Sequence, residues 1–330
     1  CTRFEQLSSN KQSGKAHTNS TNAAERPSGR SSVWLPRLAA LTAACTLFLL
    51  LAGALVVGTR SSLSVPDWPL SFGKVMPPMV GGVFYEHGHR MVATTVGFLM
   101  TVLAIWLWMA EPRAWVRRLG IIGLVAVILQ GILGGITVLY LLPAPISISH
   151  ACLAQIFFCI ALTLALATSD YWQRPVVPLR EDGQPAFHHL CAAATASIFL
   201  QLITGAGLRH RLFSILPHLS TLLLVCFMVG WVIYRAMRMP EQRPFQQICM
   251  AQGGLLILQI LLGMAAYFAR ESHAGLPGPA PSVVWLTSIH LVTGASMLGL
   301  TWLLTVLAFR RSAATMVGYA SAEMAGRAAR

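Results

Sequence analysis

The chain has 330 residues, of which 55% are hydrophobic and only 11% charged, and its mean hydropathy is +0.63. This composition lies far outside the range of soluble globular proteins. The net charge of +13, from 24 basic and 11 acidic residues, does not require a nucleic-acid partner, because its distribution along the chain indicates membrane orientation instead.

The chain begins with a polar segment and continues with apolar ones. Residues 1–37 are expected to form a disordered cytoplasmic tail, because the first 32 residues are polar and lack apolar periodicity. No cleavable signal pattern precedes the first apolar stretch, which is therefore expected to serve as its own targeting signal.

Eight apolar stretches follow, and each has the roughly 20 residues needed to cross a bilayer. They cover residues 38–59, 83–110, 119–142, 148–169, 186–207, 215–234, 247–269 and 283–309. The loops between them are short and leave no room for a separate soluble domain. The sequence therefore predicts an all-α polytopic membrane protein with eight transmembrane helices and the lipid bilayer as its surroundings.

The basic residues predict how the helices are oriented. One side of the membrane receives 18 Lys and Arg residues, counting both ends and alternate loops, and the other side receives five. Because cytoplasmic loops carry the excess of basic residues, both termini are expected in the cytoplasm. The basic, Ala-, Leu- and Arg-rich tails favour a cell inner (plasma) membrane, although they do not exclude a mitochondrial homologue.

The two halves of the chain repeat one another. LQGILGGITVLY, from Leu129, resembles LQILLGMAAYFA, from Leu258, and each precedes a Pro-containing loop and a His-bearing span. The sequence therefore predicts two tandem four-helix bundles related by pseudo-two-fold symmetry. They are expected at residues 38–170 and 186–310, followed by a cytoplasmic tail at 311–330. The small residues near these repeats, among them Gly134, Gly205 and Gly263, are expected to allow close helix approach.

Four histidines fall within the predicted spans, one on each even-numbered span: His89, His150, His218 and His290. All lie within about eight residues of the outer end, at a depth of up to roughly 12 Å. One such histidine alone would be interpreted as an interhelical hydrogen bonder, whereas four at equal depth on alternate helices indicate a shared chemical role.

Two imidazoles on facing helices of a bundle can ligate a haem iron from opposite faces. Zinc would favour closer spacing with carboxylates or thiolates, and only Glu86 is near. The pattern favours two haem-sized sites, one in each half.

The halves differ in one respect that suggests chemistry. Only the first half has a carboxylate one turn before its first histidine, with Glu86 and His89 at i, i+3 on one helix face. It also has the longest outward loop, TRSSLSVPDWPLSFGKVMPPMVGG, and loops of this length are usually functional or disordered. This asymmetry predicts that one site reacts while the other holds a cofactor.

The loop element GTRSSLSVPDWPLSFG, the span element YEHGHRMVATTVGF and the four span histidines together resemble the haem A synthase family over about residues 38–310. The resemblance implies an oxidoreductase of haem A biosynthesis and cytochrome oxidase assembly. It would oxidise the C8 methyl of haem O to a formyl group by successive hydroxylations. It also implies the haem O-forming enzyme and an electron acceptor as partners, and it leaves a homo-oligomer open.

The resemblance also assigns roles to individual residues. His218 and His290 would ligate the iron of a haem b cofactor, and His89 and His150 would face the iron of the substrate haem. Glu86 would be the catalytic acid, base or proton relay. Some family members carry a cysteine pair in the first outward loop, which here has serines and no cysteine. Basic residues on the outward side are candidate partners of the haem propionates: Arg60, Lys74, Arg90, Arg209, Arg211 and Arg270, with Arg90 the foremost.

Two other functions stay open at this point. A dihaem electron carrier would keep both haems as permanent cofactors, but it needs neither Glu86 nor an asymmetric loop. A haem transporter or chaperone would use the histidines only to hold cargo. Because a bundle of this kind supports all three functions, the choice depends on the site.

Overall fold

The computed structural model describes residues 33–179, 183–239, 242–275 and 277–328. The predicted tail lies almost entirely outside these residues, and its last few residues, from Trp34, are helical. The helices are α1 (Trp34–Gly58), α2 (Gly82–Ala110), α3 (Ala114–Leu139), α4 (Ala144–Thr168), α5 (Asp170–Gln173), α6 (Phe187–Arg209), α7 (Ile215–Met237), α8 (Arg243–Ser272) and α9 (Pro281–Ala328).

The all-α prediction is confirmed. Within the described residues, eight helices are long and apolar enough to cross a membrane. No strand occurs in this part of the chain, where extended pairing is limited to an isolated bridge between Ser71 and Lys74. The chain is a multi-pass membrane protein.

The last helix is longer than the predicted span 283–309. α9 continues to Ala328, so most of the segment 311–330, expected as a tail, is helical. That segment is rich in alanine and contains no proline, and alanine has the highest intrinsic helix propensity. Hydropathy detects only where the apolar run ends, whereas a helix of this composition can extend beyond it.

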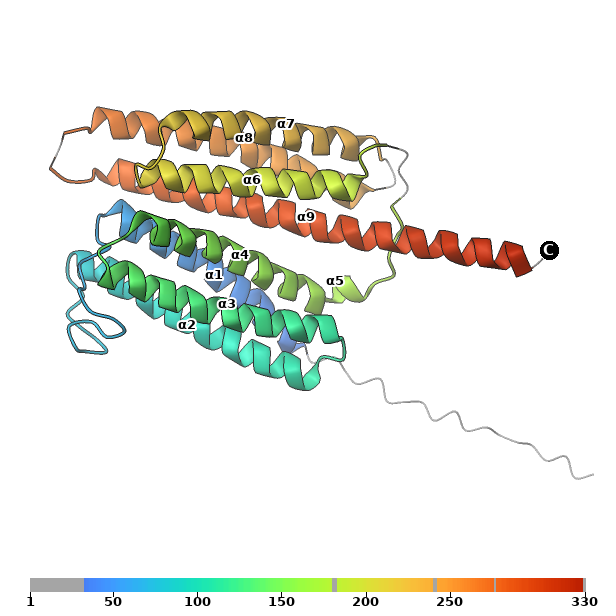
Figure 1. Cartoon of the computed structure of the whole chain (residues 1–330), viewed down its shortest axis with the longest axis horizontal. Helices are drawn as coiled ribbons and strands as arrows, with labels where there is room; N and C mark the ends of the chain where they lie inside the picture. The colour runs from blue at the N-terminus through green and yellow to red at the C-terminus, as the bar shows by residue number, and fades with distance from the viewer. Residues whose placement is uncertain (1–32, 180–182, 240–241, 276, 329–330) are drawn as a thin grey trace, which may run out of the picture. The chain divides into compact units, whose positions relative to one another are not determined.

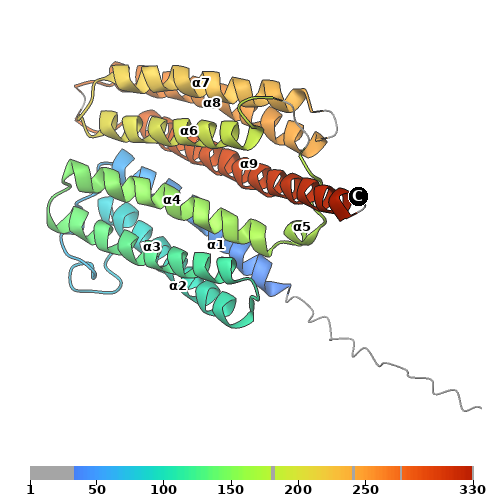
Figure 2. The same cartoon turned by 45° about the vertical axis from the view of Figure 1, so that its right-hand side comes forward.

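The helices pack as two four-helix groups. α1 packs against α2 and α4, and α3 packs against the same two helices, so α2 and α4 lie diagonally opposite. In the same way α6 and α8 each pack against α7 and α9, which places α7 and α9 diagonally. Both groups are visible side by side in Figure 1 and again after rotation in Figure 2. This arrangement is consistent with the predicted tandem bundles and their pseudo-symmetry.

The two bundles meet through α1 and α4 on one side and α6 and α9 on the other. Trp302 on α9 donates a hydrogen bond from its indole Nε1 to Thr163 Oγ1 on α4 at 2.8 Å. Gly299 lies against Leu162 and Phe158 of α4, and a methyl group at this glycine would lie 2.7 Å from Leu162 Cδ1. The interface thus combines close contact at a small residue with a polar contact, as is typical of membrane helices.

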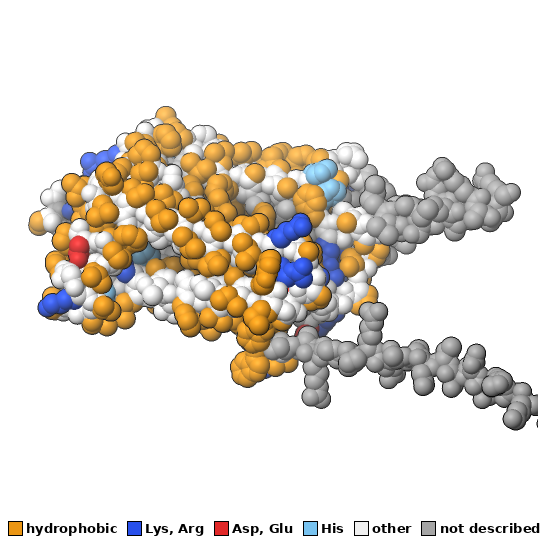
Figure 3. All heavy atoms as spheres, turned by 60° about the horizontal axis from the view of Figure 1, so that its bottom comes forward, with side chains coloured by type: hydrophobic (Ala, Val, Ile, Leu, Met, Phe, Trp, Pro, Cys, Tyr) orange, Lys and Arg blue, Asp and Glu red, His pale blue; other side chains and the backbone are white. Residues whose placement is uncertain are grey.

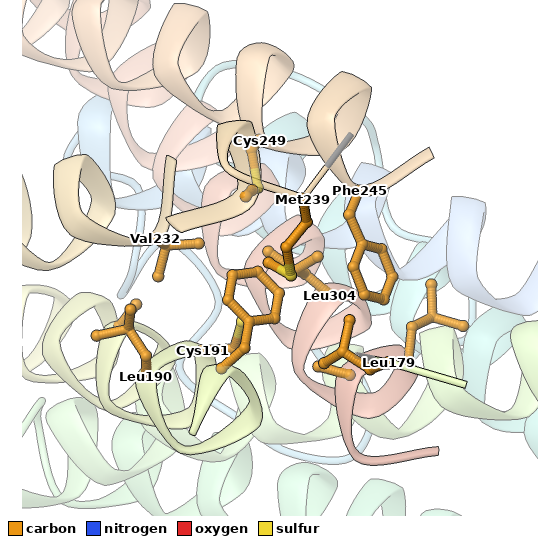
Figure 4. Close-up of a cluster of buried hydrophobic side chains, with 13 residues drawn as sticks. Leu179, Leu190, Cys191, Val232, Met239, Phe245, Cys249 and Leu304 are labelled. Atoms are coloured by element: carbon orange, nitrogen blue, oxygen red, sulfur yellow. The ribbon is translucent and has the colours of Figure 1, made fainter. Parts of the chain in front are cut away.

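The second bundle has a dense core at the end where α6 and α8 begin. Figure 4 shows side chains from several helices meeting there, including Leu190, Cys191, Val232, Phe245 and Leu304. The Phe187 and Phe245 rings stack with centroids 5.8 Å apart. Because lipid tails are as apolar as these side chains, dispersion from close packing stabilises this core more than hydrophobic transfer does.

The outer surface is apolar along the helices. Large side chains such as Phe98, Leu223 and Ile257 are more than half exposed. Figure 3 shows hydrophobic side chains covering the flank of the molecule, with basic side chains gathered toward its two ends. Such a surface is stable in lipid and would aggregate in water.

Candidate functional site

The four span histidines lie near the starts of α2, α4, α7 and α9, which are at the same end of both bundles (Figure 1). We call this end the loop end, because it carries the loop 59–81. His89 and His150 are on the diagonal pair of the first bundle, and His218 and His290 on that of the second. The predicted histidine layer is therefore present.

The rings of each diagonal pair are close enough to interact electrostatically, His89 with His150 and His218 with His290. Within the described residues, no group of three or more His, Cys, Asp or Glu side chains could hold a metal ion. Structural and catalytic zinc sites use at least three protein ligands, whereas a haem iron takes two axial ones. Two imidazoles per bundle therefore fit a haem better than a bare metal ion.

A glycine of the preceding helix backs each of these histidines. The pairs are Gly53 with His89, Gly134 with His150, Gly205 with His218 and Gly263 with His290, and a methyl group on these glycines would lie 3.1, 3.3, 3.1 and 2.9 Å, respectively, from the imidazole Cε1. The space left by these glycines admits an imidazole ring rather than a second helix backbone, which corrects the role expected for three of them. Gly53 was not singled out by the sequence.

A glutamine four residues before the glycine accompanies three of the four pairs. The amide Nε2 atoms of Gln130, Gln201 and Gln259 lie 3.4, 3.3 and 3.4 Å from Nε2 of His150, His218 and His290. The Q-x-x-x-G spacing of these three pairs is visible in the sequence and would have identified the recurrence. At the matching position of α1 stands Leu49, so His89 lacks this partner.

The other ring nitrogen, Nδ1, distinguishes the bundles. In the second bundle, His218 Nδ1 lies 3.3 Å from the Thr204 hydroxyl and His290 Nδ1 lies 3.2 Å from the backbone carbonyl of Gln259. In the first bundle, Nδ1 of His89 and Nδ1 of His150 are buried, with no hydrogen-bond partner among the described residues. A hydrogen bond at the second nitrogen fixes the ring and strengthens the histidine as a ligand.

Glu86 is almost fully buried at the first-bundle site. Its Oε2 accepts a hydrogen bond from the backbone N–H of Val65 at 2.9 Å, and its Oε1 accepts one from Arg90 Nη2 at 2.9 Å. Oε2 therefore joins the loop 59–81 directly to α2, whereas Oε1 pairs with Arg90 on the same helix. This anchoring function was not foreseen from the sequence, which singled out Glu86 for chemistry alone.

Arg90 holds the same loop. Its Nη1 donates to the carbonyl oxygens of Asp67 and Leu70 at 2.8 and 2.9 Å, and its Nη2 donates to that of Val65 at 3.3 Å. The guanidinium that was expected to bind a haem propionate is thus engaged in loop contacts. Its binding to a propionate stays a prediction.

The loop is also ordered from within by Asp67, whose carboxylate accepts hydrogen bonds from the backbone N–H groups of Phe72 and Gly73 at 2.7 and 2.8 Å. These bonds, aided by the charge of Arg90, lower the pKa of Asp67 below its usual 3.8. The next residue, Trp68, packs its indole on Gly135 of α3, adjacent to the glycine that backs His150. The loop is therefore held against both α2 and α3 at the loop end of the first bundle.

The remaining outward basic residues lie apart from Glu86. Arg209 lies beside Arg270 at the loop end of the second bundle. The other three are exposed: Arg60, Lys74 and Arg211. His87, next to Glu86, is buried and its Nδ1 lies 2.8 Å from Ser71 Oγ, so it too contributes to holding the loop.

Comparison with known proteins identifies relatives of this site. The family described as cytochrome oxidase assembly protein (COX15-CtaA) matches residues 80–212, which contain Glu86, His89 and His150. A haem A synthase of Bacillus licheniformis is 26% identical over 265 residues, covering 72% of this chain and 87% of the relative. The haem A synthase of Halalkalibacterium halodurans is 31% identical over 183 residues, covering 52% and 57%, respectively.

That of Shouchella clausii is 38% identical over 110 residues, covering 32% of this chain and 36% of the relative. The matches agree with the resemblance found in the loop and span motifs. Over these segments the chain is similar to haem A synthases.

Proposed function

We propose that the chain is a haem A synthase, which oxidises the C8 methyl group of haem O to a formyl group and supplies haem A to terminal oxidases. The observation that carries this proposal is the difference between two otherwise alike diagonal histidine pairs. Only the pair in the first bundle has a buried carboxylate and an anchored loop beside it. The names of the relatives support the same reaction.

In this proposal the second bundle holds a haem b cofactor through His218 and His290. Both rings have an Nδ1 partner, so Nε2 of each can face the iron in a fixed orientation. A bound bis-histidine haem accepts electrons one at a time, and conversion of a methyl to a formyl removes four electrons from the substrate. The second bundle is therefore the resident redox site.

The first bundle binds haem O as substrate, with His89 and His150 facing its iron. Their buried Nδ1 atoms have no partner in the described structure, which makes both rings weaker and less rigid ligands than those of the second bundle. A substrate site must release its product, so weaker ligation suits this function.

Glu86 is proposed as the acid, base or proton relay of the first bundle. It lies one turn before His89 on α2, and a carboxylate within reach of the reacting group can take the proton that each hydroxylation releases. In this proposal the loop 59–81, held by Glu86, Arg90 and Asp67, limits the access of water to the bound substrate.

We further propose that the chain lies in the cell inner membrane with both termini in the cytoplasm, because basic residues are concentrated on one side. The loop end would then face outward. The haem O-forming enzyme and an electron acceptor are the expected partners.

The experiment that tests the function is extraction and mass analysis of haem from cells that express the chain with a haem O-forming enzyme. Wild type is expected to yield haem A or its hydroxymethyl precursor. Glu86→Ala is expected to lower the yield by about 10²–10⁴-fold, the usual contribution of a positioned acid or base. Unchanged haem O in the wild-type sample would refute the synthase and favour the dihaem electron carrier.

Two controls separate chemistry from loop anchoring. Asp67→Ala loosens the same loop but leaves the Glu86 carboxylate in place, and it is expected to retain most of the product yield. Glu111→Gln alters a second buried carboxylate that also pairs with an arginine, Arg113, at 2.6 Å, but at the opposite end of α2. A loss with Asp67→Ala as large as that with Glu86→Ala would show that Glu86 acts only by holding the loop.

A further inference from the structure

A closed group of polar side chains surrounds His218 inside the second bundle. The Thr204 hydroxyl lies 3.3 Å from His218 Nδ1 and 3.0 Å from the Thr221 hydroxyl. Thr221 in turn donates to Gln201 Oε1, and the amide nitrogen of Gln201 lies 3.3 Å from His218 Nε2. Two side chains of α6, Thr204 and Gln201, thus contact the two nitrogens of one imidazole, and Thr221 of α7 links those two side chains.

The chemistry of these groups defines the direction of each bond. A glutamine amide nitrogen can only donate, so Nε2 of His218 must accept and carries a lone pair. The ring proton of the neutral imidazole is then on Nδ1, which donates to the Thr204 oxygen. Thr204 can accept it because its own hydrogen is directed to the Gln201 backbone carbonyl at 3.0 Å. The group selects the tautomer whose Nε2 carries the lone pair, which a bound iron would take in place of the Gln201 amide.

This hydroxyl is specific to one histidine. Thr204 directly precedes the glycine that backs His218, and the matching positions on α1, α3 and α8 are Ala52, Leu133 and Leu262. His290 obtains an equivalent Nδ1 contact from the Gln259 backbone. His150 has no hydroxyl at this position, and the Gln130 backbone interacts with its ring without a hydrogen bond to Nδ1, which lies 3.9 Å from a methyl group on Gly134 compared with 3.4 Å for His218 and Gly205.

We propose that Thr204 is a positioning residue for the haem b ligand His218, holding its ring in the Nδ1–H tautomer with the help of Gln201 and Thr221. This inference rests on the proposed function of the second bundle as the cofactor site. It explains how two bundles with the same histidine geometry can differ in how tightly they retain haem.

The test is the rate at which haem b leaves the full-length protein for excess apomyoglobin, followed by absorbance. It is measured in a His150→Ala background, so that the haem followed is that of the second bundle. Thr204→Val, which removes the hydroxyl at nearly constant volume, is expected to speed haem loss by about 10–100-fold, as for other outer-shell partners of ligating histidines. Thr204→Ser should restore slow loss.

Thr301→Val on α9 is the matched control, because the Thr301 hydroxyl is buried and bonds only to its own helix, at Met297 O. It should leave the rate unchanged. Equal rates for Thr204→Val and Thr301→Val would overturn the proposal. If wild type forms no haem A but Thr204→Val still loses haem b faster, the positioning role stands and only the proposed reaction falls.

A second variant tests the idea independently of the second bundle's folding. Leu133→Thr places a hydroxyl at the first-bundle position that corresponds to Thr204, where it can accept from His150 Nδ1. It is expected to slow the loss of haem O about tenfold. Ile132→Thr, the same type of change at the neighbouring lipid-exposed residue, should have no effect. No slowing with Leu133→Thr would contradict the proposal.

Discussion

Two carboxylates, those of Glu86 and Asp67, hold the loop 59–81 through hydrogen bonds. Glu86 and Asp67 both accept backbone N–H groups of this loop, Glu86 from the buried side and Asp67 from the exposed side. Backbone N–H bonds favour the ionised form of an acid. The charge state of the exposed one, Asp67, should therefore influence how firmly the loop is held.

Acidification should loosen this loop. The pKa of Asp67 is lowered in the folded protein, so its contribution is fully present above the ordinary value of 3.8 and is lost as the pH falls through the depressed folded value. We expect the protection factors for amide hydrogen exchange in residues 64–74 to fall below about pH 3.8 in wild type. In Asp67→Asn the protection factors of these residues should be low at all pH values. A wild-type loop whose protection does not change down to pH 2 would contradict this.

The sequence identifies the candidate chemical residues more readily than the side chains that contact them. Glu86 and the four histidines stand out because ionisable groups are rare and costly in apolar helices. Thr204 and Gln201 do not stand out, since threonine and glutamine are tolerated in membrane helices and their partners lie on a neighbouring helix. The loop contacts of Arg90 likewise depend on how the chain folds back onto α2, which no local pattern indicates.

At the scale of helices, the repeated unit is a glycine on one helix facing a histidine on the next. The glycine leaves space that the imidazole ring fills, and the histidine approaches most closely at Gly263, where a methyl group would lie 2.9 Å from His290 Cε1. Each unit therefore sets the orientation of one candidate iron ligand by shape.

A methyl group at Gly263 should displace the ring of His290. We expect Gly263→Ala to lower haem b retention by about tenfold or more, because a misplaced ligand weakens metal binding. Gly254→Ala on the same helix is the control, as nothing lies within 4 Å of its added methyl, and alanine there should be neutral or slightly stabilising. Haem content measured by the pyridine haemochrome spectrum distinguishes the two, and equal retention would rule out the steric role.

Helix number and order were predictable because each span is a long apolar run, and the observed helices begin within about five residues of the predicted starts. The extension of α9 to Ala328 was missed because helix propensity, not hydropathy, governs it. The sequence repeat predicted two four-helix bundles, but it did not specify which helices lie diagonally opposite within each bundle. It is the packing of α2 with α3 and of α4 with α1 that places His89 and His150 opposite one another.

At the scale of the whole molecule, the described part of the chain holds its bundles together through α9, which packs on α1, α4, α6 and α8. The polar contact in this interface is the bond from Trp302 Nε1 to Thr163 Oγ1. In a membrane, such interhelical hydrogen bonds contribute about 0.6 kcal/mol on average.

A double-mutant cycle should detect this contact. We expect Trp302→Phe and Thr163→Val to be coupled by roughly 0.6 kcal/mol in the free energy of unfolding in detergent, because each removes one partner of the same bond. Trp302→Phe combined with Thr46→Val, whose hydroxyl bonds only to Thr42 O on α1, should be additive. A coupling indistinguishable from zero for the first pair would show that this bond does not join the bundles.

In the proposed function the two bundles have different roles: the first binds and oxidises haem O, and the second retains haem b. The most direct test is the mass-resolved haem content of purified His89→Ala and His218→Ala, each prepared from cells with and without a haem O-forming enzyme. We expect His89→Ala to keep haem b but to lose haem O and haem A, whereas His218→Ala should lose haem b and form no haem A but still bind haem O. Loss of the same haem from both variants would contradict it.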